Sequence, residues 1–315
     1  MKQEVYSRLE GVLTKGQLLK NEPMKKHTTF RIGGAADCFA APATKEEVKE
    51  IVAVCKEMQV PYYIVGNGSN LLVSDEGYRG VIIQLYKEMS AITVDENVIR
   101  AQAGASLAKI ANAALDASLT GFEFAAGIPG TVGGACVMNA GAYGGEMSQV
   151  VTAVTCMDEN GDISTVTEFD FGYRHSTFSD GRRLILSAEF KLEQGDRDAI
   201  KARMDELAAQ RQAKQPLEYP SAGSMFKRPV GYFAGALVEQ AGLKGLTVGG
   251  AQVSEKHAGF VINVGGAQVS EKHAGFVINA GGATCSDVLE LVHQVQLRVR
   301  ENFGVELEME VRVLK

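Results

Sequence analysis

Two glycine-rich loops constrain the fold of this 315-residue chain more than any other feature. The first, GNGSN at 66–70, directly follows Tyr62–Val65, an apolar run typical of a buried strand. The second, GIPGTVGG at 127–134, precedes a segment that we predict to be a short helix. Glycine lets backbone N–H groups approach a phosphate closely, and the first amides of a helix also favour an anion. Neither loop is a Rossmann or Walker motif, and each alone is more often a tight turn, but together they indicate a dinucleotide cofactor.

The composition is that of a globular protein with a few special backbone sites. Glycine makes up 35 of the 315 residues, which exceeds the ordinary share of about 7%. The excess lies in a few loops, so it indicates local backbone requirements rather than disorder. Hydrophobic residues make up 45% and charged residues 22%, and the length allows two or three domains.

The charge balance and the cysteines narrow the class of protein. A net charge of −6 without a basic cluster argues against nucleic acid as a partner. The first residues, MKQEVYSRLEGVL, contain no apolar stretch resembling a signal peptide, and no apolar run approaches the roughly 18 to 20 residues that span a membrane. Five cysteines without a CxxC pair fit neither a disulfide framework nor a zinc site. We therefore expect a cytoplasmic protein with reduced thiols, no bound metal and no membrane contact.

Hydrophobic periodicity predicts helices and strands along the whole chain. Residues 1–22 fit a short helix and a polar loop. Further helices are predicted at 45–59, 106–118, 196–214, 231–241 and 286–303. Strands are predicted at 62–65, 71–74, 81–85, 92–94, 98–103, 150–157, 163–167, 184–192 and 305–314. The turn DENGD makes a hairpin of the strands at 150–157 and 163–167, and a change from strand-rich to helix-rich sequence near 195 marks a domain boundary.

Local signals predict where several of these helices begin and end. Thr44 is a candidate N-cap, with Glu47 completing a capping box. Ser106 and Ser286 are candidate N-caps of their helices, and Gly304 ends the last one.

An exact tandem duplication is peculiar to this chain. Residues 248–263 and residues 264–279 both read VGGAQVSEKHAGFVIN. Solenoid repeats diverge and need at least three units, so the duplication is no solenoid. We expect the fold to have room for only one copy. Because the connection between FVIN and the last long helix is short, we expect Gly275–Asn279 of the second copy to form the strand. The surplus residues would then lie between Val248 and Lys272, with Phe260–Ile262 exposed.

Three further segments contain side chains that could do chemistry, although each also has a plain structural interpretation. YRHSTF at 173–178 contains Arg174, which by itself is more often a solvated surface residue. SAGSMFKRP at 221–229 contains Ser224, Lys227 and Arg228, and it also fits a turn before a helix. Glu310 lies in the alternating run 305–314, on a face where three of four residues are acidic, so the pattern does not single it out. By default His257 and His273 are structural hydrogen-bonding groups.

Seven segments spread over nearly the whole chain form an ordered set. They are HTTFRIGG (27–34), VGNGSNLLVSDEGYRG (65–80), GIPGTVGGACVMNAGAYGGE (127–146), FGYRHSTF (171–178), PLEYPSAGSMFKRP (216–229), AGLKGLTVGGAQVSEKHAGFVIN (241–263) and LEMEVRVL (307–314). Together, and in this order, they resemble the UDP-N-acetylenolpyruvoylglucosamine reductase (MurB) family. Because no long insertion follows YRHSTF, the chain resembles the shorter of the family's two types. The sixteen-residue duplication is the one departure from the family pattern.

The resemblance implies an α+β fold with an FAD-binding domain of the vanillyl-alcohol-oxidase (PCMH) type and a C-terminal α+β substrate-binding domain. The implied limits are an N-terminal helix and loop at 1–22, the FAD-binding region in two subdomains at 23–195, the substrate-binding domain at 196–300, and a last strand at 301–315 that returns to the active site. The implied cofactor is non-covalent FAD, reduced by NADPH. The implied partner is a small-molecule substrate, UDP-N-acetylglucosamine enolpyruvate, and we expect a monomer.

The resemblance also assigns residues. Arg174 matches the family's arginine that stabilises developing negative charge, Ser224 its proton donor, and Glu310 its catalytic glutamate. Lys227 and Arg228 lie where contacts to the substrate pyrophosphate are expected. The implied FAD-binding residues are Gly66, Asn67, Gly68, Ser69, Asn70, Leu71, Gly127, Ile128, Pro129, Gly130, Thr131, Gly133, Gly134, Asn139, Gly141 and Ala142.

Two alternatives remain open at this point. A flavin oxidase of the same fold class acting on a sugar or alcohol would share the glycine loops but lack the YRHS, AGSMF and EVR segments. A flavin-binding protein made inactive by the duplication is the other alternative, and the duplication is its only support.

Overall fold

The computed structural model describes residues 3–263 and 282–315, which form two compact units. Of the described residues, the first unit comprises 3–21, 37–67 and 79–210, and the second comprises 22–36, 68–78, 211–263 and 282–315. Each unit has its own hydrophobic core. The units are interleaved along the chain, because two short N-terminal segments belong with the C-terminal third. The functional domain limits drawn from the sequence stay a prediction.

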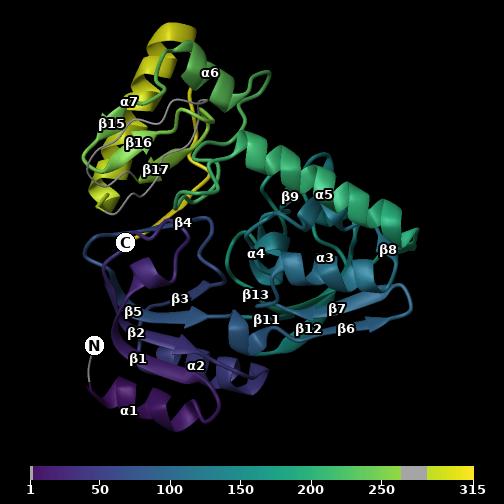
Figure 1. Cartoon of the computed structure of the whole chain (residues 1–315). Helices are drawn as coiled ribbons and strands as arrows, with labels where there is room; N and C mark the ends of the chain where they lie inside the picture. Colours follow the sequence, from purple (N-terminus) through teal and green to yellow (C-terminus); the bar gives the residue numbers. More distant parts are fainter. Residues whose placement is uncertain (1–2, 264–281) are drawn as a thin grey trace. The chain divides into compact units, whose positions relative to one another are not determined.

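The first unit contains a four-stranded sheet in the order β1–β2–β5–β3. β3 and β5 are parallel, and Tyr62 lies opposite Val81. Helices α1 and α2 pack together below this sheet in the view of Figure 1. The elements are α1 (Gln3–Val12), β1 (Gln17–Pro23), β2 (Ala35–Ala41), α2 (Lys45–Glu57), β3 (Tyr62–Val65) and β5 (Tyr78–Gln84).

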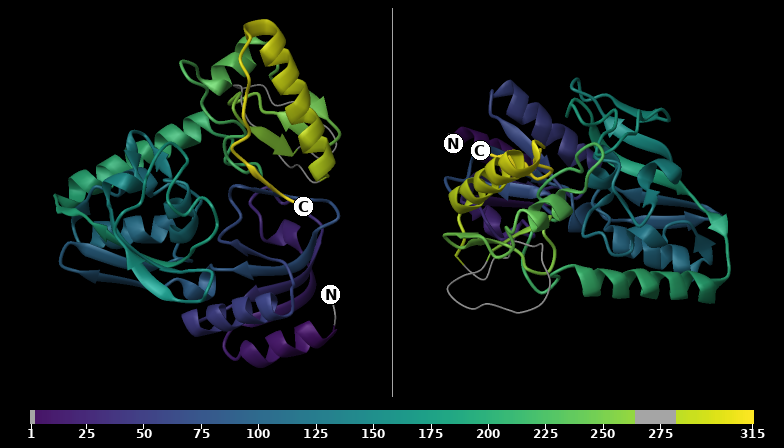
Figure 2. Two further views of the ribbon diagram at one scale, coloured as in Figure 1. Left: turned by 180° about the vertical axis from the view of Figure 1, so that it is seen from behind. Right: turned by 90° about the horizontal axis from the view of Figure 1, so that it is seen from above.

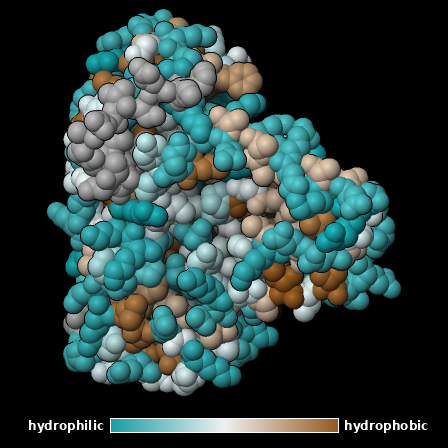
Figure 3. Space-filling view, viewed as in Figure 1, coloured by the Kyte–Doolittle hydropathy of each residue, from teal (hydrophilic) through white to brown (hydrophobic). Residues whose placement is uncertain are grey.

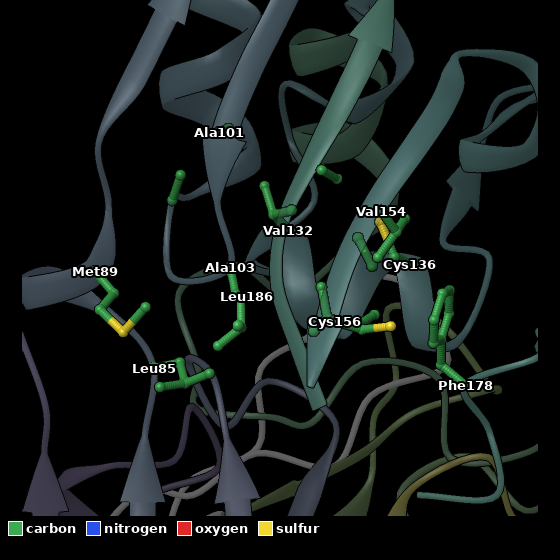
Figure 4. Packing of buried hydrophobic residues seen from close by; sticks show 14 of the residues in the cluster. Leu85, Met89, Ala101, Ala103, Val132, Cys136, Val154, Cys156, Phe178 and Leu186 are labelled. Atoms are coloured by element: carbon green, nitrogen blue, oxygen red, sulfur yellow. The ribbon is translucent and has the colours of Figure 1, made fainter. Parts of the chain in front are cut away.

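A five-stranded antiparallel sheet, β12–β11–β13–β7–β6, forms the rest of the first unit. Helices α3 and α4 pack on it, and Figure 4 shows Val132 and Cys136 of α4 in the core that they share with the strands. The predicted hairpin is confirmed as β11 and β12. The elements are β6 (Ile92–Asp95), β7 (Val98–Gln102), α3 (Leu107–Asp116), α4 (Val132–Val137), β11 (Val151–Met157), β12 (Ile163–Val166) and β13 (Leu184–Lys191).

Short elements complete the first unit. Two-stranded pairs join β8 to β14 and β9 to β10. Their bounds, with those of the 3-10 helices, are β8 (Leu119–Thr120), β9 (Gly141–Ala142), β10 (Gly145–Glu146), β14 (Glu193–Gln194), η2 (Lys87–Met89), η3 (Glu123–Ala125) and η4 (Met147–Gln149). The long helix α5 (Arg197–Lys214) leads from the first unit into the second.

The second unit is built on the antiparallel sheet β15–β16–β17, against which α7 packs (Figures 1 and 2). α6 also packs on α7. A separate parallel pair joins the C-terminal strand β18 to β4, the strand that follows the first glycine loop. The elements are η1 (Met24–Lys26), β4 (Leu71–Val73), α6 (Ala234–Gln240), β15 (Thr247–Val248), β16 (Ala251–Val253), β17 (Val261–Asn263), α7 (Cys285–Phe303) and β18 (Arg312–Leu314).

Most predicted helix ends are confirmed, and two details are wrong. Thr44 and Ser106 are the N-caps of α2 and α3, and Gly304 ends α7 at a φ of 65°. Glu47 does not complete a capping box with Thr44, because its carboxylate accepts hydrogen bonds from the N–H groups of Ala43 and Lys15 instead. α7 is capped by Thr284 rather than Ser286.

Two strand predictions also need correction. The predicted polar loop before residue 22 contains β1, which forms an edge of the four-stranded sheet. The predicted strand at 305–314 is strand only at Arg312–Leu314, with an isolated bridge between Met309 and Phe226. Alternation in sequence therefore does not show how much of a run finds a partner strand.

The first copy of the duplication is built into the second unit. Its residues form β16 and β17, and Gln252 lies opposite Ile262. Phe260, Val261 and Ile262 are buried, with 7%, 1% and 2% of their surface exposed. The prediction that this run is surplus and exposed is therefore wrong. The segment Gly275–Asn279, predicted to occupy the native strand, lies outside the described residues.

One face of the surface is mostly polar (Figure 3) and the five cysteines are unpaired, as the composition of the chain predicts. The face in Figure 3 is mostly hydrophilic, and its apolar residues lie in separate patches. All five cysteines are buried and free, and burial raises the pKa of the Cys136 thiol to about 12. Within residues 3–263 and 282–315, no helix has the length and apolar character needed to cross a membrane.

Candidate active site

The first glycine loop begins where β3 ends, and its own chain crowds its glycines. Gly68 has a φ of +64°, and a Cβ there would lie 2.2 Å from the carbonyl oxygen of His27. A Cβ on Gly66 would lie 2.2 Å from Oγ1 of Thr131, which belongs to the second glycine loop. Asn67 Nδ2 donates to the carbonyl of Pro129 at 2.8 Å. These contacts hold residues 66–67 of the first loop directly against the second.

The second glycine loop leads into α4, a helix of six residues. The N–H groups of Val132 and Gly133 donate to the carbonyls of Ala105 and Ala103, at 3.0 and 2.9 Å. The sequence interpretation in which the first amides of this helix face a pyrophosphate therefore does not hold for these two residues. The loop instead allows a ligand to lie close against its backbone.

Two glycines of the second loop, Gly130 and Gly134, have room for a side chain. A Cβ on Gly130 would meet its nearest neighbour at 3.7 Å, and one on Gly134 would do so at 3.9 Å. Neither residue has a positive φ. The packing of the described chain therefore does not require glycine at these two positions, whereas a ligand lying against the backbone would.

Arg174 lies at the tip of a tight turn in the first unit. Gly172 and His175 exchange two backbone hydrogen bonds, of 3.1 and 3.2 Å, around it. Arg174 has a φ of 55°, a backbone conformation that costs a non-glycine residue free energy and is often found at functional sites. Asn139 Nδ2 donates to the carbonyl of Gly172 at 3.2 Å, and Ser176 Oγ donates to that of Val137 at 2.7 Å. The turn is therefore anchored to the end of α4.

The Ser224 segment pairs with the Glu310 segment in the second unit. The N–H of Glu310 donates to the carbonyl of Met225 at 2.8 Å, and Phe226 and Met309 form an isolated bridge. On its other side, the N–H of Met225 donates to the carbonyl of Gly259 at 2.8 Å. Two predicted catalytic residues that are far apart in the sequence thus lie on adjacent stretches of backbone. Gly259 belongs to the first copy of the duplication, which therefore supports this arrangement.

The structure distinguishes Glu310 from its acidic neighbours, which the sequence pattern does not. Glu306, Glu308 and Arg312, on the same face of the alternating run, are exposed, whereas Glu310 is half-buried. The carbonyl of Glu310 accepts a hydrogen bond of 3.1 Å from Asn70 Nδ2.

The two predicted pyrophosphate contacts have partners within the chain. Lys227 forms an ion pair with Glu308, and its N–H donates to the carbonyl of Glu308 at 2.9 Å. The guanidinium of Arg228 lies over the ring of Phe233, 4.5 Å from the centroid. His257 is a structural group, because its Nδ1 accepts the N–H of Gly259 and burial lowers its pKa.

The remaining predicted cofactor residues occupy ordinary positions around the two loops. Leu71 begins β4 and is buried, and Gly141 and Ala142 form β9. Ser69 and Ile128 are half-buried, and Gly127 and Pro129 are exposed. Arg174 belongs to the first unit, and Ser224 and Glu310 belong to the second.

Sequence reasoning missed the side chains that hold the loops in place. Gln84 Nε2 donates to the carbonyl of Gly66 at 3.1 Å, yet Gln84 only ends a strand in the sequence. The family resemblance implies that Asn139 is a cofactor residue, and in the structure its amide anchors the Arg174 turn. Nothing in the local sequence indicates either bond, because each partner lies far along the chain.

Comparison with known families and proteins agrees with this geometry. A family model described as "FAD binding domain" matches residues 36–167. The model of the UDP-N-acetylenolpyruvoylglucosamine reductase C-terminal domain matches residues 215–269 and again residues 262–314. The two C-terminal matches overlap inside the duplicated region, as expected if that domain has room for one copy.

Full-length relatives carry the same name. The chain is 48% identical to the UDP-N-acetylenolpyruvoylglucosamine reductase of Caldanaerobacter subterraneus, over 100% of this chain and 99% of that protein. It is 46% identical to that of Clostridioides difficile, over 99% and 98%. The crystal structure of the reductase from Thermus caldophilus matches with a TM-score of 0.76 and 35% identity, over 96% of this chain and 99% of that one.

These matches confirm the predicted α+β fold, with an FAD-binding domain and a C-terminal domain of the reductase. From the ordered loops, the paired Ser224 and Glu310 segments and the full-length relatives, we conclude that the chain belongs to the UDP-N-acetylenolpyruvoylglucosamine reductase family, oxidoreductases of peptidoglycan precursor synthesis.

Proposed function

We propose that this protein reduces UDP-N-acetylglucosamine enolpyruvate to UDP-N-acetylmuramate, with NADPH as hydride donor and non-covalent FAD as cofactor. The observation that carries the proposal is the pairing of Met225 with Glu310, which brings the predicted proton donor and the predicted catalytic carboxylate onto neighbouring backbone. That the enzyme works as a cytoplasmic monomer stays a prediction, which cell fractionation and size-exclusion chromatography test.

The two glycine loops fit FAD. The second loop would take the cofactor along Gly130 and Gly134, where the chain leaves room that a Cβ would fill. Asn67 and Thr131 would hold the two loops in register for it, through the contacts to Pro129 and Gly66. When bound and reduced by NADPH, the flavin would supply a hydride to the terminal carbon of the enolpyruvyl group.

Arg174 would stabilise the negative charge that develops on the substrate. Hydride addition places charge on the carbon next to the carboxylate, and donors already in position lower that barrier. The planar guanidinium suits a carboxylate because it donates two parallel hydrogen bonds. Because Asn139 and Ser176 anchor the Arg174 turn, the backbone that carries the guanidinium would be in place before substrate arrives.

Ser224 would deliver the proton that completes the reduction. A serine hydroxyl is a weak acid in water, so close positioning and neighbouring groups must assist it. Glu310 would be that neighbouring group: it is half-buried, and its N–H donates to the carbonyl of Met225, the residue after Ser224. Glu310 would assist in stabilising the intermediate that Ser224 protonates.

Stopped-flow measurement of the two half-reactions tests these roles. In Ser224→Ala we expect flavin reduction by NADPH to continue almost unchanged, and flavin reoxidation by the enolpyruvyl nucleotide to slow by about 10²- to 10⁴-fold. Ser221→Ala, in the same segment, is the matched control and should alter neither step. Equal slowing of both steps in Ser224→Ala would make Ser224 structural and contradict its assignment as proton donor.

The cofactor is tested separately. The purified protein should be yellow and should release its flavin on denaturation, and a colourless protein that takes up no FAD would contradict the proposal. Rapid reoxidation of the reduced flavin by air, without the enolpyruvyl nucleotide, would favour the oxidase alternative. Bound FAD without turnover would favour a protein made inactive by the duplication.

A further inference from the structure

Asn70 joins the first glycine loop to the C-terminal strand through two hydrogen bonds. Its side-chain Nδ2 donates to the carbonyl of Glu310 at 3.1 Å. Its own carbonyl accepts the N–H of Arg312 at 3.1 Å. From the next residue onward, β4 and β18 continue as a parallel pair, with Leu71 opposite Arg312. Asn70 therefore lies at the start of a register that runs to the end of the chain.

The backbone of Glu310 is held on both sides. Its N–H donates to the carbonyl of Met225 at 2.8 Å, and its carbonyl accepts the Asn70 amide. When both polar groups of a residue are bonded, its backbone dihedrals are restricted and the direction of its Cα–Cβ bond is defined. Of these two bonds, only the one from Asn70 comes from a side chain. A substitution at Asn70 can therefore remove it without changing the backbone.

The family resemblance implies a different role for Asn70, as an FAD-binding residue. In the structure its Nδ2 faces a protein carbonyl 240 positions away in the sequence. We propose that Asn70 is a positioning residue for Glu310: it orients the carboxylate through the Glu310 carbonyl and thereby serves the step in which the substrate is protonated. The inference rests on the proposed function for the role of Glu310, but not for the contact itself.

Hydrogen exchange tests the contact without any catalytic assay. Asn70→Asp keeps the size of the side chain but loses the donor, and Asn70→Ala removes the side chain. In both, we expect the backbone amides at 308–312 to exchange about five-fold faster, as for the loss of one ordinary hydrogen bond. Gln84→Ala is the matched control, because it removes an amide-to-carbonyl bond of the same length at the other end of the loop. Unchanged exchange at 308–312 in the Asn70 variants would overturn the proposal.

Kinetics then test whether the contact serves catalysis. In Asn70→Ala and Asn70→Asp we expect flavin reduction by NADPH at saturating FAD to stay near wild type, and reoxidation by the enolpyruvyl nucleotide to slow at least ten-fold. If Asn70 acts through Glu310, the double variant Asn70→Ala/Glu310→Gln should be no slower than Glu310→Gln alone. Multiplying effects in the double variant, or loss of FAD binding with unchanged exchange, would overturn the inference. A wild-type enzyme that never passes hydride to the nucleotide would instead overturn the proposed function, and the exchange result would still decide the contact.

Discussion

In the loop at 66–70 a Cβ on Gly68 would lie 2.2 Å from a backbone oxygen, whereas in the loop at 127–134 a Cβ on Gly134 would meet nothing nearer than 3.9 Å. Both loops are rich in glycine, and the sequence alone suggests one reason for both. The structure separates two reasons. In the first loop the chain's own packing and a positive φ require glycine. In the second, Gly130 and Gly134 leave space that the chain does not use.

A third glycine pair, in the docked copy of the duplication, belongs with the first loop. Gly249 has a φ of +53°, and a Cβ there would collide with the carboxylate of Asp287. A Cβ on Gly250 would lie 2.5 Å from the backbone nitrogen of Ala283. Crowding by the protein itself thus identifies structural glycines, and we predict that the unused room at Gly130 and Gly134 serves the cofactor. Four substitutions test this distinction.

Gly68→Ala should have the largest effect. The substitution forces a side chain into a left-handed conformation and against the backbone at His27 and Thr28, which cannot move aside easily. We expect the free energy of unfolding to fall by about 3 to 5 kcal/mol, from the dihedral cost and the overpacking together. Urea denaturation of the FAD-free protein measures it. A loss below about 1 kcal/mol would mean that the loop rearranges without cost and that the comparison is wrong.

Gly250→Ala should have the next largest effect, and it also reports which copy is docked. A Cβ there meets the backbone of Ala283, so we expect a loss of about 1 to 3 kcal/mol. The matched comparison is Gly266→Ala, the same substitution in the second copy, because the variant with the larger fall in the midpoint of urea denaturation identifies the copy that packs against Ala283. The reverse outcome, a stable Gly250→Ala and an unstable Gly266→Ala, would show that the second copy can take the place of the first.

Gly66→Ala should destabilise less, because its nearest neighbour is a side chain. The new Cβ would collide with Oγ1 of Thr131, and shortening that residue to alanine removes the colliding atom. We expect a loss of about 1 to 2 kcal/mol for Gly66→Ala, most of it recovered in the double variant Gly66→Ala/Thr131→Ala. Additive losses in this double-mutant cycle would show that the two loops are not in direct contact.

Gly134→Ala should have the smallest effect on stability, and of the opposite sign. Gly134 lies within α4, where alanine is favoured over glycine by about 0.5 to 1 kcal/mol, and the site has room for the Cβ. The FAD-free protein should therefore become slightly more stable, while FAD binds at least ten-fold more weakly in a fluorescence titration. Unchanged FAD affinity would remove Gly134 from the cofactor site.

Local sequence predicted local structure well and fails where a distant partner intervenes. Thr44 and Ser106 cap their helices as predicted, because an N-cap needs only the next three residues. At α7 the sequence predicts Ser286 as the N-cap, two residues after the true N-cap, Thr284. The N–H and the hydroxyl of Ser286 both donate to the carboxylate of Asp75, 211 positions away in the sequence. The side chain of Thr284 caps the helix instead. No local pattern contains that carboxylate.

The sequence by itself determined the amphipathic helices, the β11–β12 hairpin, the two glycine loops and, through its ordered motifs, the family. Those features depend on neighbours a few residues apart. Only the tertiary structure decided that Glu310, of the four charged residues on one face of the run 305–314, is half-buried. It also decided which carbonyls the Asn70 and Asn139 amides bond to, and which glycines are crowded. It also placed the first copy of the duplication in the sheet. Two identical segments have identical local preferences, so only their different connections to the rest of the fold can distinguish them.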